Sequence, residues 1–257
     1  MKPKVLILHA TGTNRDGEAA WAAKAAGGRP QIVHVNELRE RRACLDDFQM
    51  LILPGGFSYG DALGAGRLWA TDLRWLFQDE LARFIEAGKP VLGICNGFQA
   101  LVKSGWLPGP PENGIQATLT RNASNRFECR WVWLAPEPGS PCVFTRDLSD
   151  MIYCPVAHGE GRFVPGDHAA LERLHAGRLI ALSYVDVGGG PAAYPDNPND
   201  SVAGIAGVCN ERGTVLGLMP HPEDHILPVQ HPRWGRGENG CPGLPIFAQG
   251  MRYAAGL

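Results

Sequence analysis

The sequence lacks any apolar run long enough to span a membrane, because its apolar segments are short and are broken by glycine, proline or charged residues. A transmembrane helix needs about 20 consecutive and mostly apolar residues, so we expect no membrane span. Near the N-terminus, the apolar run from Val5 to Leu8 is soon followed by Thr11 and Gly12. That run is too short for a signal peptide, and we interpret it as a first strand.

The sequence also carries little net charge, since 24 Lys and Arg residues are balanced by 26 Asp and Glu residues. Domains that bind nucleic acid usually concentrate Lys and Arg, so we expect no nucleic acid partner. Internal repeats, low-complexity segments, linkers and a glycine-rich phosphate-binding loop are not evident either. The composition is that of a soluble globular protein. We therefore expect a single domain over residues 1–257.

The sequence has seven cysteines but no Cys-x-x-Cys pair, and their spacing is irregular. An odd count with irregular spacing argues against a disulfide framework. We therefore expect reduced cysteines and a cytoplasmic location, with most of the thiols serving as small buried hydrophobic groups. The cysteines are Cys44, Cys95, Cys129, Cys142, Cys154, Cys209 and Cys241.

Short apolar segments alternate with helical patterns in the first half of the chain. Strands are predicted at 5–8, 32–35, 50–53 and 91–94, and helices at 17–26, capped by Asp16, and at 72–87. Such alternation predicts an α/β fold with a mostly parallel central sheet flanked by helices.

The chain changes character after Trp106, where prolines become frequent. We expect an additional antiparallel section here, followed by a long polar loop and a hairpin, and then an irregular extension at 226–245. The predicted strands are 115–119 and 127–134, the loop is 186–201, and the hairpin strands are 202–208 and 215–219.

Residues 90–99 contain the pattern Gly-x-Cys-x-Gly, in which Gly93 and Gly97 flank Cys95. This pattern is the cysteine counterpart of the nucleophile elbow, in which a strand meets a helix at a sharp, strained turn. The N–H groups at the start of the following helix favour a thiolate. A buried structural cysteine between two turn glycines explains this segment alone equally well.

Two further segments lie directly after predicted strands. Gly55 and Gly56 follow 50–53, and carboxyl ends of parallel strands meet at one edge of a sheet. His221 follows the strand ending at Met219, and Glu223 lies two positions later. In extended backbone these two side chains point to the same side, so the carboxylate can orient the imidazole. A polar turn after a strand is the simpler explanation of His221 and Glu223 taken alone.

Together these segments resemble the class I (triad) glutamine amidotransferases, which share a flavodoxin-like α/β fold. The resemblance is most specific to the family of glutaminase subunits of phosphoribosylformylglycinamidine synthase, which act in purine biosynthesis. It spans residues 5–225 in the expected order. The matching segments are Gly12–Asp16, Pro54–Asp61, Gly93–Gln99, Ala157–Arg162 and Tyr194–Asn199.

The resemblance implies that Cys95 attacks the side-chain amide of glutamine, with His221 as acid and base and Glu223 as its orienting partner. It also implies an oxyanion hole formed by the backbone N–H groups of Gly56 and Asn96. The released ammonia would pass through a channel to a large synthase subunit, assembled with a small accessory subunit. ATP and Mg²⁺ would be used by that large subunit, and no cofactor or metal is expected in this chain.

Five residues are weaker candidates for contacts with glutamine. Gln99 lies one helical turn beyond Cys95, and the backbone at His158 and Gly159 could hold the α-amino or α-carboxylate group. Asn122 and Ser124 are polar loop residues that would also serve simply as turn caps. We further expect a partner to organise the loops around Gly56 and at 186–201.

The chain departs from the family pattern at several positions. Asp200 stands where glycine is expected, and Asp224 stands where a basic residue is common. The stretch from Ala62 to Gly64 is smaller than usual. None of these departures involves Cys95, His221 or Glu223.

Three other functions remain open from the sequence. A zinc hydrolase could use His221, His225, His231 and Cys241, although nearby prolines oppose a single helix face. A non-catalytic binding or regulatory module could keep the fold alone. A cysteine-elbow peptidase or chaperone would share the elbow, but we do not expect it to share the His-Pro-Glu segment.

Overall fold

The computed structural model describes residues 2–240 and 242–257. Its main feature is a nine-stranded sheet with the order β2-β1-β3-β4-β11-β10-β9-β6-β7, and a two-stranded sheet pairs β5 with β8. The strands of the main sheet are β1 (Lys4–His9), β2 (Arg29–His34), β3 (Met50–Leu53), β4 (Val91–Ile94), β6 (Glu128–Pro136), β7 (Ile152–His158), β9 (Ile180–Val185), β10 (Ile205–Cys209) and β11 (Val215–Leu218). The small sheet consists of β5 (Ala117–Thr120) and β8 (Arg162–Pro165).

Parallel and antiparallel strands occupy separate halves of the main sheet. Pairing is parallel from β2 through β1, β3 and β4 to β11. It is antiparallel from β11 through β10, β9 and β6 to β7. The predicted α/β fold with an antiparallel section is therefore confirmed.

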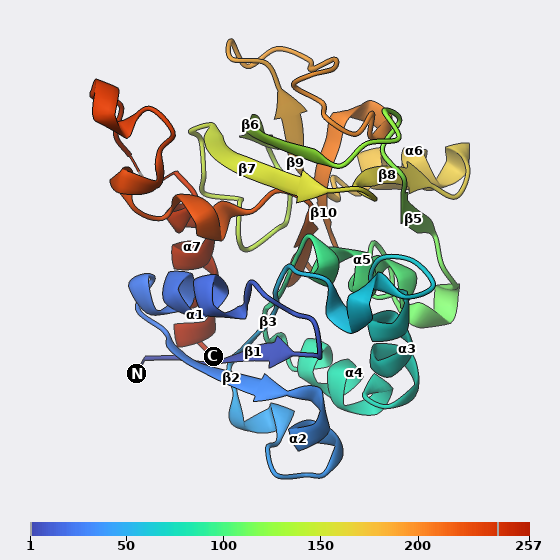
Figure 1. Ribbon diagram of the computed structural model, residues 1–257. Helices are drawn as coiled ribbons and strands as arrows, with labels where there is room; N and C mark the ends of the chain where they lie inside the picture. The colour runs from blue at the N-terminus through green and yellow to red at the C-terminus, as the bar shows by residue number, and fades with distance from the viewer. Residues whose placement is uncertain (1, 241) are drawn as a thin grey trace.

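Helices cover both faces of the parallel half (Figure 1). Helices α1 and α7 lie on one side of the strands, and α3, α4 and α5 lie on the other. The helices are α1 (Asp16–Ala25), α2 (Val35–Arg39), α3 (Arg67–Trp75), α4 (Gln78–Glu86), α5 (Asn96–Lys103), α6 (His168–Ala176) and α7 (Leu244–Ala255). Large side chains from these helices fill the core on both faces, among them Trp69, Phe84, Phe98 and Phe247.

Strands 50–53 and 91–94 are confirmed at their predicted bounds, and the helix predicted at 17–26 is confirmed as α1. The single helix predicted at 72–87 and the cap predicted at Asp16 are wrong. The segment 72–87 forms the end of α3 and all of α4, because Phe77 leaves the helical conformation and Asp79 and Glu80 favour a new helix start. Asp16 does not cap α1, since Arg15 holds the cap position and the Asp16 carboxylate bonds His9 Nδ1 at 2.8 Å.

Helix α7 was not predicted from the sequence. Before it, the described residues from Ile226 to Gly243 form loops and two short 3₁₀ turns, Pro228–Gln230 and Trp234–Arg236. The helix then packs with α1 against the sheet and buries Ile246, Phe247 and Met251. Within the described residues, no helix combines the length and hydropathy needed to cross a membrane.

Glycine is required at the junction between β4 and α5. A Cβ on Gly97 would lie 2.0 Å from the backbone oxygen of Leu53, and one on Gly93 would lie 2.5 Å from Leu101 Cδ1. Helix α5 can approach β3 and β4 this closely only because both positions lack a side chain. The elbow predicted around Cys95 therefore depends on contacts from a neighbouring strand.

We expect Gly97→Ala to lower the free energy of unfolding by about 3 kcal/mol, because the added methyl group must displace the β3 backbone. Gly17→Ala is the matched control, since nothing lies within 4 Å of a Cβ there and the position is helical. The control should be more stable than the wild type by about 0.5 kcal/mol. Urea denaturation of both variants tests this prediction, and equal effects would contradict it.

Candidate active site

Cys95 lies at the turn between β4 and α5 with φ 48° and ψ −102°. This backbone conformation is sparsely populated by residues other than glycine and is held in place by its surroundings. The Cys95 N–H donates to the Leu218 oxygen at 2.8 Å, and the side chain is 5% exposed. The sulfur therefore stands at the start of α5, as the elbow pattern predicts.

The register of the sheet brings the segment with His221 and Glu223 to Cys95. Strand β11 pairs in parallel with β4, and Leu218 lies opposite Ile94. The segments that follow β4 and β11 therefore begin side by side at the same edge of the sheet. The His221 N–H then donates to the Pro155 oxygen of β7 at 2.8 Å, which fixes the turn that carries the imidazole.

His221 and Glu223 form a buried hydrogen-bonded pair. Nδ1 of His221 lies 2.7 Å from Oε1 of Glu223, and the side chains are 3% and 0% exposed. The sequence predicts extended backbone here, and that prediction is wrong. Pro222 begins a 3₁₀ turn (η5, Pro222–His225) with His221 as its cap. The tight turn folds the carboxylate back onto the ring.

The imidazole of His221 lies beside Cys95. A Cβ on Gly55 would come within 2.6 Å of His221 Cε1 and 3.5 Å of Cys95 Cβ, so both side chains pack against this glycine. Nε2 of His221 has no hydrogen-bond partner in the described part of the chain. That nitrogen is available to exchange a proton with a reacting group.

Charge favours a protonated imidazole in this site. Burial acts to lower the pKa of His221, but the Glu223 carboxylate and a Cys95 thiolate together outweigh it and raise the pKa well above its usual value. An imidazolium next to a cysteine sulfur is the setting in which the thiolate is favoured. The arrangement is therefore that of an activated nucleophile with an oriented base.

Asp224 adds a second carboxyl group behind the pair. Burial and then the Glu223 carboxylate raise the pKa of Asp224 to about 6. Arg15, from the start of α1, is its basic partner, with Nη1 3.4 Å from Oδ1. The departure from the family pattern at Asp224 is thus accommodated by an ion pair with the N-terminal part of the chain.

The two residues predicted to form an oxyanion hole flank Cys95. Asn96 is the first residue of α5, where backbone N–H groups have no partner within the helix. Gly56 has φ +138°, and a Cβ there would lie 2.7 Å from the Asn14 nitrogen. An antiparallel bridge to Thr13 holds Gly56 in place, and Asn96 Oδ1 accepts from the Ser58 N–H at 3.2 Å.

A cavity of about 170 Å³ opens beside the Cys95 sulfur. Rings of Phe57 and Phe127 stand at its margin with centroids 6.5 Å apart and are each about half exposed. The structure thus brings together Gly56, Cys95 and three of the candidate substrate contacts. The lining residues are Gly56, Phe57, Asp61, Ala65, Cys95, Gln99, Phe127, Ala157, His158, Gly159 and Glu160.

Gln99 and Glu160 are connected inside this cavity. Gln99 Nε2 donates to the Glu160 backbone oxygen at 2.7 Å, and Gln99 Oε1 accepts from Asn96 Nδ2 at 3.0 Å. Glu160 was part of a recognised segment but was given no role from the sequence. Its position after β7 was the available signal, because β7 ends at the same edge of the sheet as β4.

Asn122 and Ser124 lie outside the lining of the cavity. Asn122 Oδ1 is 3.1 Å from His158 Nδ1 and accepts from the Gly161 N–H at 2.9 Å. Ser124 donates to Glu128 Oε1 at 2.6 Å. In this structure Asn122 orients His158, and Ser124 supports a neighbouring strand.

Asp200 has φ +60°, which explains why glycine is expected at that position. Its neighbour Asn199 is fully buried and donates to the Gly161 oxygen at 2.9 Å. The Asp200 carboxylate pairs with Arg162 at 3.0 Å. Asn199 was not singled out from the sequence, and it holds the loop that carries His158 and Glu160.

The zinc alternative finds little support in the described residues. The single group of three potential ligands among them is His221, Glu223 and Asp224, in which His221 Nδ1 is already engaged by Glu223. His225 instead places Nδ1 2.5 Å from the Tyr153 oxygen. Cys241 lies outside the described residues.

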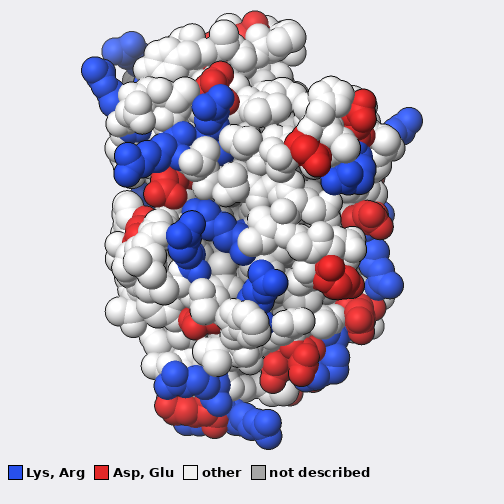
Figure 2. Space-filling model, turned by 90° about the vertical axis from the view of Figure 1, so that its right-hand side faces the viewer, with Lys and Arg blue, Asp and Glu red and all other residues white. Residues whose placement is uncertain are grey.

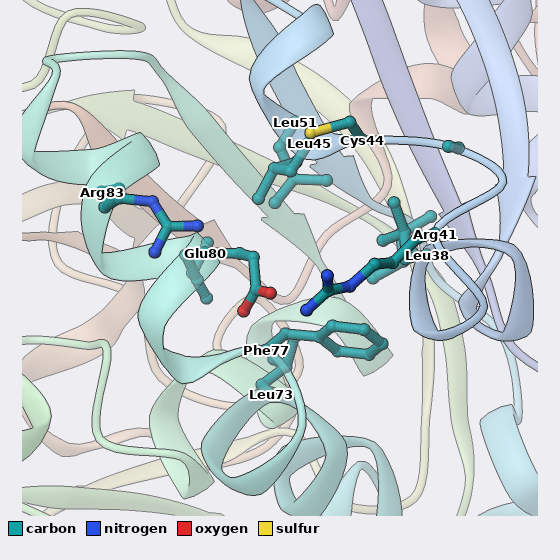
Figure 3. Close-up of a pocket in the computed structure, with 12 residues that line it drawn as sticks. Leu38, Arg41, Cys44, Leu45, Leu51, Leu73, Phe77, Glu80 and Arg83 are labelled. Atoms are coloured by element: carbon teal, nitrogen blue, oxygen red, sulfur yellow. The ribbon is translucent and has the colours of Figure 1, made fainter.

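A second cavity, of about 340 Å³, lies on the sheet face covered by α4 and combines a leucine-rich wall with charged side chains (Figure 3). Arg41, Glu80 and Arg83 are charged, and Cys44 brings a free thiol. It holds no nucleophile paired with a base, and none of the predicted site residues line it. Among the described residues, the predicted site residues that the structure brings together lie at the edge of the sheet at Cys95.

We expect Gly55→Ala to lower the reactivity of Cys95, because the methyl group would displace the His221 ring from the sulfur. The rate of alkylation by iodoacetamide near neutral pH should fall by at least about tenfold, which corresponds to 1.4 kcal/mol. Gly17→Ala should alkylate at the wild-type rate. Unchanged alkylation in Gly55→Ala would show that His221 does not activate the thiol.

His158 should make the protein less stable in acid. Burial, and then the charge of His221, lower the pKa of His158 to about 4, whereas an unfolded histidine titrates near 6.5. The contribution of His158 to the free energy of unfolding is therefore fully present above about pH 6.5. It falls toward pH 4 by up to about 1.4 kcal/mol per pH unit, because the unfolded chain takes up the proton first.

Urea denaturation between about pH 7 and pH 5 measures this slope. His158→Gln keeps a hydrogen-bonding side chain but cannot titrate. It should lose some stability at pH 7 and show a shallower dependence on pH than the wild type. Parallel curves for the two proteins would contradict the assignment.

Comparison with known proteins identifies the family of the chain. Residues 2–254 match the family model of the CobB/CobQ-like glutamine amidotransferase domain. The chain is 51% identical to phosphoribosylformylglycinamidine synthase subunit PurQ of Treponema denticola, over 88% of this chain and 90% of that protein. It is 46% identical to subunit PurQ of Dehalococcoides mccartyi, over 98% of both proteins.

A solved structure agrees with these sequence relatives. The structure of PurLQS from Thermotoga maritima contains a chain that superimposes with a TM-score of 0.74 at 33% identity, covering 98% of this chain and 99% of that one. The elbow cysteine, the buried histidine–glutamate pair and the half-parallel, half-antiparallel sheet are thus found in a chain with close relatives along nearly its whole length. The chain belongs to the CobB/CobQ-like glutamine amidotransferase family and, within it, to the PurQ subunits of phosphoribosylformylglycinamidine synthase.

Proposed function

We propose that this chain hydrolyses L-glutamine to glutamate and ammonia with Cys95 as nucleophile, His221 as acid and base, and Glu223 as the residue that orients His221. One observation carries the proposal: the Glu223–His221 hydrogen bond of 2.7 Å is buried, and its imidazole packs beside Cys95. The three residues come from two neighbouring parallel strands. A structural cysteine would not need a base held in this way.

The first half-reaction forms a thioester. The Cys95 thiolate attacks the amide carbon of the glutamine side chain, and the carbonyl oxygen becomes negatively charged. Backbone N–H groups of Gly56 and Asn96 would stabilise this oxyanion, and such a donor typically contributes about 3 kcal/mol. The imidazolium of His221 gives its Nε2 proton to the departing nitrogen, so the C–N bond breaks and ammonia leaves.

The second half-reaction regenerates the enzyme. His221, now neutral, removes a proton from water, and the resulting nucleophile attacks the thioester carbon. The C–S bond breaks, glutamate leaves, and the Cys95 thiolate and the imidazolium are restored. Glu223 fixes the proton on Nδ1 throughout both steps, which keeps Nε2 directed at the reacting groups.

Glutamine would be held in the cavity beside Cys95. Gln99 and the backbone of His158 and Gly159 line it, and they are the candidates for contacts with the α-amino and α-carboxylate groups. Asn122 would act indirectly by holding His158. Ser124 would act more remotely still, through Glu128.

The ammonia would serve a larger assembly. Because the relatives are subunits of phosphoribosylformylglycinamidine synthase and a matching chain occurs in PurLQS, we propose a large synthase subunit and a small accessory subunit as partners. Ammonia would pass through an internal channel to the large subunit. There, ATP and Mg²⁺ would support conversion of formylglycinamide ribonucleotide to formylglycinamidine ribonucleotide in purine biosynthesis.

We further propose that the described chain works as one domain in the cytoplasm. A single hydrophobic core connects both halves of the main sheet. Cysteines Cys44, Cys95, Cys129, Cys142, Cys154 and Cys209 are free, as suits a reducing compartment.

We expect Cys95→Ala to abolish release of glutamate from glutamine, with a loss of at least about 10³-fold, because no other cysteine and no serine or threonine lines the cavity. The measurement uses the chain reconstituted with a PurL-type synthase subunit and its accessory subunit. Synthesis supported by added ammonia should persist in the variant. Loss of the ammonia-supported reaction would instead indicate a failure of assembly.

Glu223→Gln tests the orienting role separately. An amide can keep a hydrogen bond to the ring but not the charge, so we expect glutamate release to fall by about 10³-fold while the affinity for glutamine changes little. Asp224→Asn is the matched control in the same turn and should retain most activity. Equal losses in both variants would show that the turn, and not the triad, is being disturbed.

A further inference from the structure

A basic groove lies behind the glutamine cavity. It is formed by α3, the end of α5 and the start of β5, and its volume is about 350 Å³. Figure 2 shows this side of the molecule, on which Lys and Arg side chains gather near the centre. The groove is lined by Arg67, Ala70, Thr71, Arg74, Trp75, Lys103, Ile115 and Thr118.

The positive charge in this groove is not neutralised by its own walls. None of the residues that line it is acidic. Arg67 and Arg74 make no ion pair within residues 2–240 and 242–257. Lys103 pairs with Glu160, with Nζ 3.4 Å from Oε2, and its Nζ also donates to the backbone oxygen of Ala65. Burial and the charge of Arg67 lower the pKa of Lys103 despite this pairing.

The groove also exposes apolar surface beside the charges. Trp75 is 74% exposed and Ile115 is 54% exposed. The guanidinium of Arg74 lies 5.8 Å from the centre of the Trp75 ring, so the charged group and the aromatic ring are neighbours in the groove. Arginine pairs well with phosphate oxygens, and exposed aromatic rings stack with nucleobases.

We propose that this groove binds a nucleoside monophosphate, with the phosphate between Arg67, Arg74 and Lys103 and the base stacked on Trp75. The volume of the groove lies within the range of small-molecule sites. The Thr118 hydroxyl is available to the sugar, and the Thr71 hydroxyl, which donates to the Arg67 oxygen at 3.1 Å, can still accept a hydrogen bond. Two guanidinium groups and one ammonium group match a single dianionic phosphate.

The wall between the groove and the glutamine cavity would connect the two sites. Glu160 and Ala65 line the glutamine cavity, and Lys103 lines the groove. Glu160 Oε2 accepts from the Ala65 N–H at 3.3 Å and pairs with Lys103. A phosphate that draws Lys103 away from Glu160 loosens this wall and changes the environment of glutamine. This coupling rests on the proposed function, whereas binding to the groove does not.

Isothermal titration calorimetry of the full chain with AMP tests binding directly. We expect a dissociation constant below about 1 mM, weakened by at least about tenfold in Arg74→Gln and in Arg67→Gln. Arg236→Gln changes an exposed arginine in the tail and should bind as the wild type does. Absence of AMP binding, or equal losses in Arg236→Gln, would overturn the proposal.

The contribution of the base is measured with inorganic phosphate and adenosine as separate probes. AMP should bind more tightly than either, and Trp75→Ala should remove its advantage over phosphate. Trp234→Ala is the matched control, because its ring is similarly exposed in the tail. Equal binding of phosphate and AMP by the wild type, or an acidic peptide that binds while AMP does not, would contradict a nucleotide site.

Coupling is tested by the rate at which a glutamine-like alkylating agent labels Cys95. AMP should change this rate at least about twofold in the wild type and leave it unchanged in Lys103→Gln. Cys95→Ala should bind AMP normally in the calorimeter. A failure of AMP to bind the groove can therefore be distinguished from a failure of the glutaminase proposal, because calorimetry measures AMP binding without any glutaminase activity.

Discussion

The left-handed turn at Cys95 is the constraint on which the rest of the site depends. Its φ of 48° is unfavourable for a residue with a side chain, at a cost of order 1–3 kcal/mol. The backbone is held there because Cys95 donates to Leu218 and because Gly97 packs on the Leu53 carbonyl. Strands on both sides of β4 thus fix the position of Cys95, the proposed nucleophile. The sulfur stands where α5 begins and where β11 delivers His221.

Charge in the site is arranged so that one imidazole is protonated and its neighbour is not. His221 gains its charge from Glu223 and Cys95, whereas burial and the same His221 charge keep His158 neutral. A neutral His158 needs partners at both ring nitrogens, and Asn122 and Asn199 lie next to them at 3.1 Å and 3.5 Å. The two asparagines therefore help to stabilise the neutral form of His158, although neither of them lines the cavity.

The sequence was sufficient for the features that depend on local pattern. Gly93, Gly97 and a short buried strand predicted the elbow, and His221 followed by Pro222 and Glu223 predicted an oriented base.

The sequence was not sufficient where a long-range contact decides the conformation. The break at Phe77 occurs inside an unbroken apolar stripe, and α7 comes after a run of Gly and Pro that masks its start. His221 and Glu223 do form the predicted pair, but through a 3₁₀ turn that begins at Pro222 and not through extended backbone. Proline favours extended structure in the residue before it but does not determine the conformation of the residues after it. Asn199 ends one of the segments that resemble the family, but its role could not be predicted from pattern alone, because its bonds reach residues about 40 positions away, such as Gly161.

The same contacts also bear on which loop a partner can organise. The loop at Gly56 is already fixed by its bridge to Thr13 and by hydrogen bonds from Ser58 to Thr13 and Asn96, so the proposed oxyanion donor needs no further ordering. The second half of the loop at 186–201 is equally fixed, since residues 197–199 and 201 are buried.

The first half of this loop is exposed. Val187 is 74% exposed and Tyr194 is 61% exposed, with Arg130 over the Tyr194 ring at 4.9 Å. The proposed partner subunit would therefore act on residues 187–196 and on the Phe57–Phe127 margin of the cavity, where large apolar side chains are exposed in the described chain. Closing this margin would hinder the escape of ammonia, without any change in the proposed triad itself.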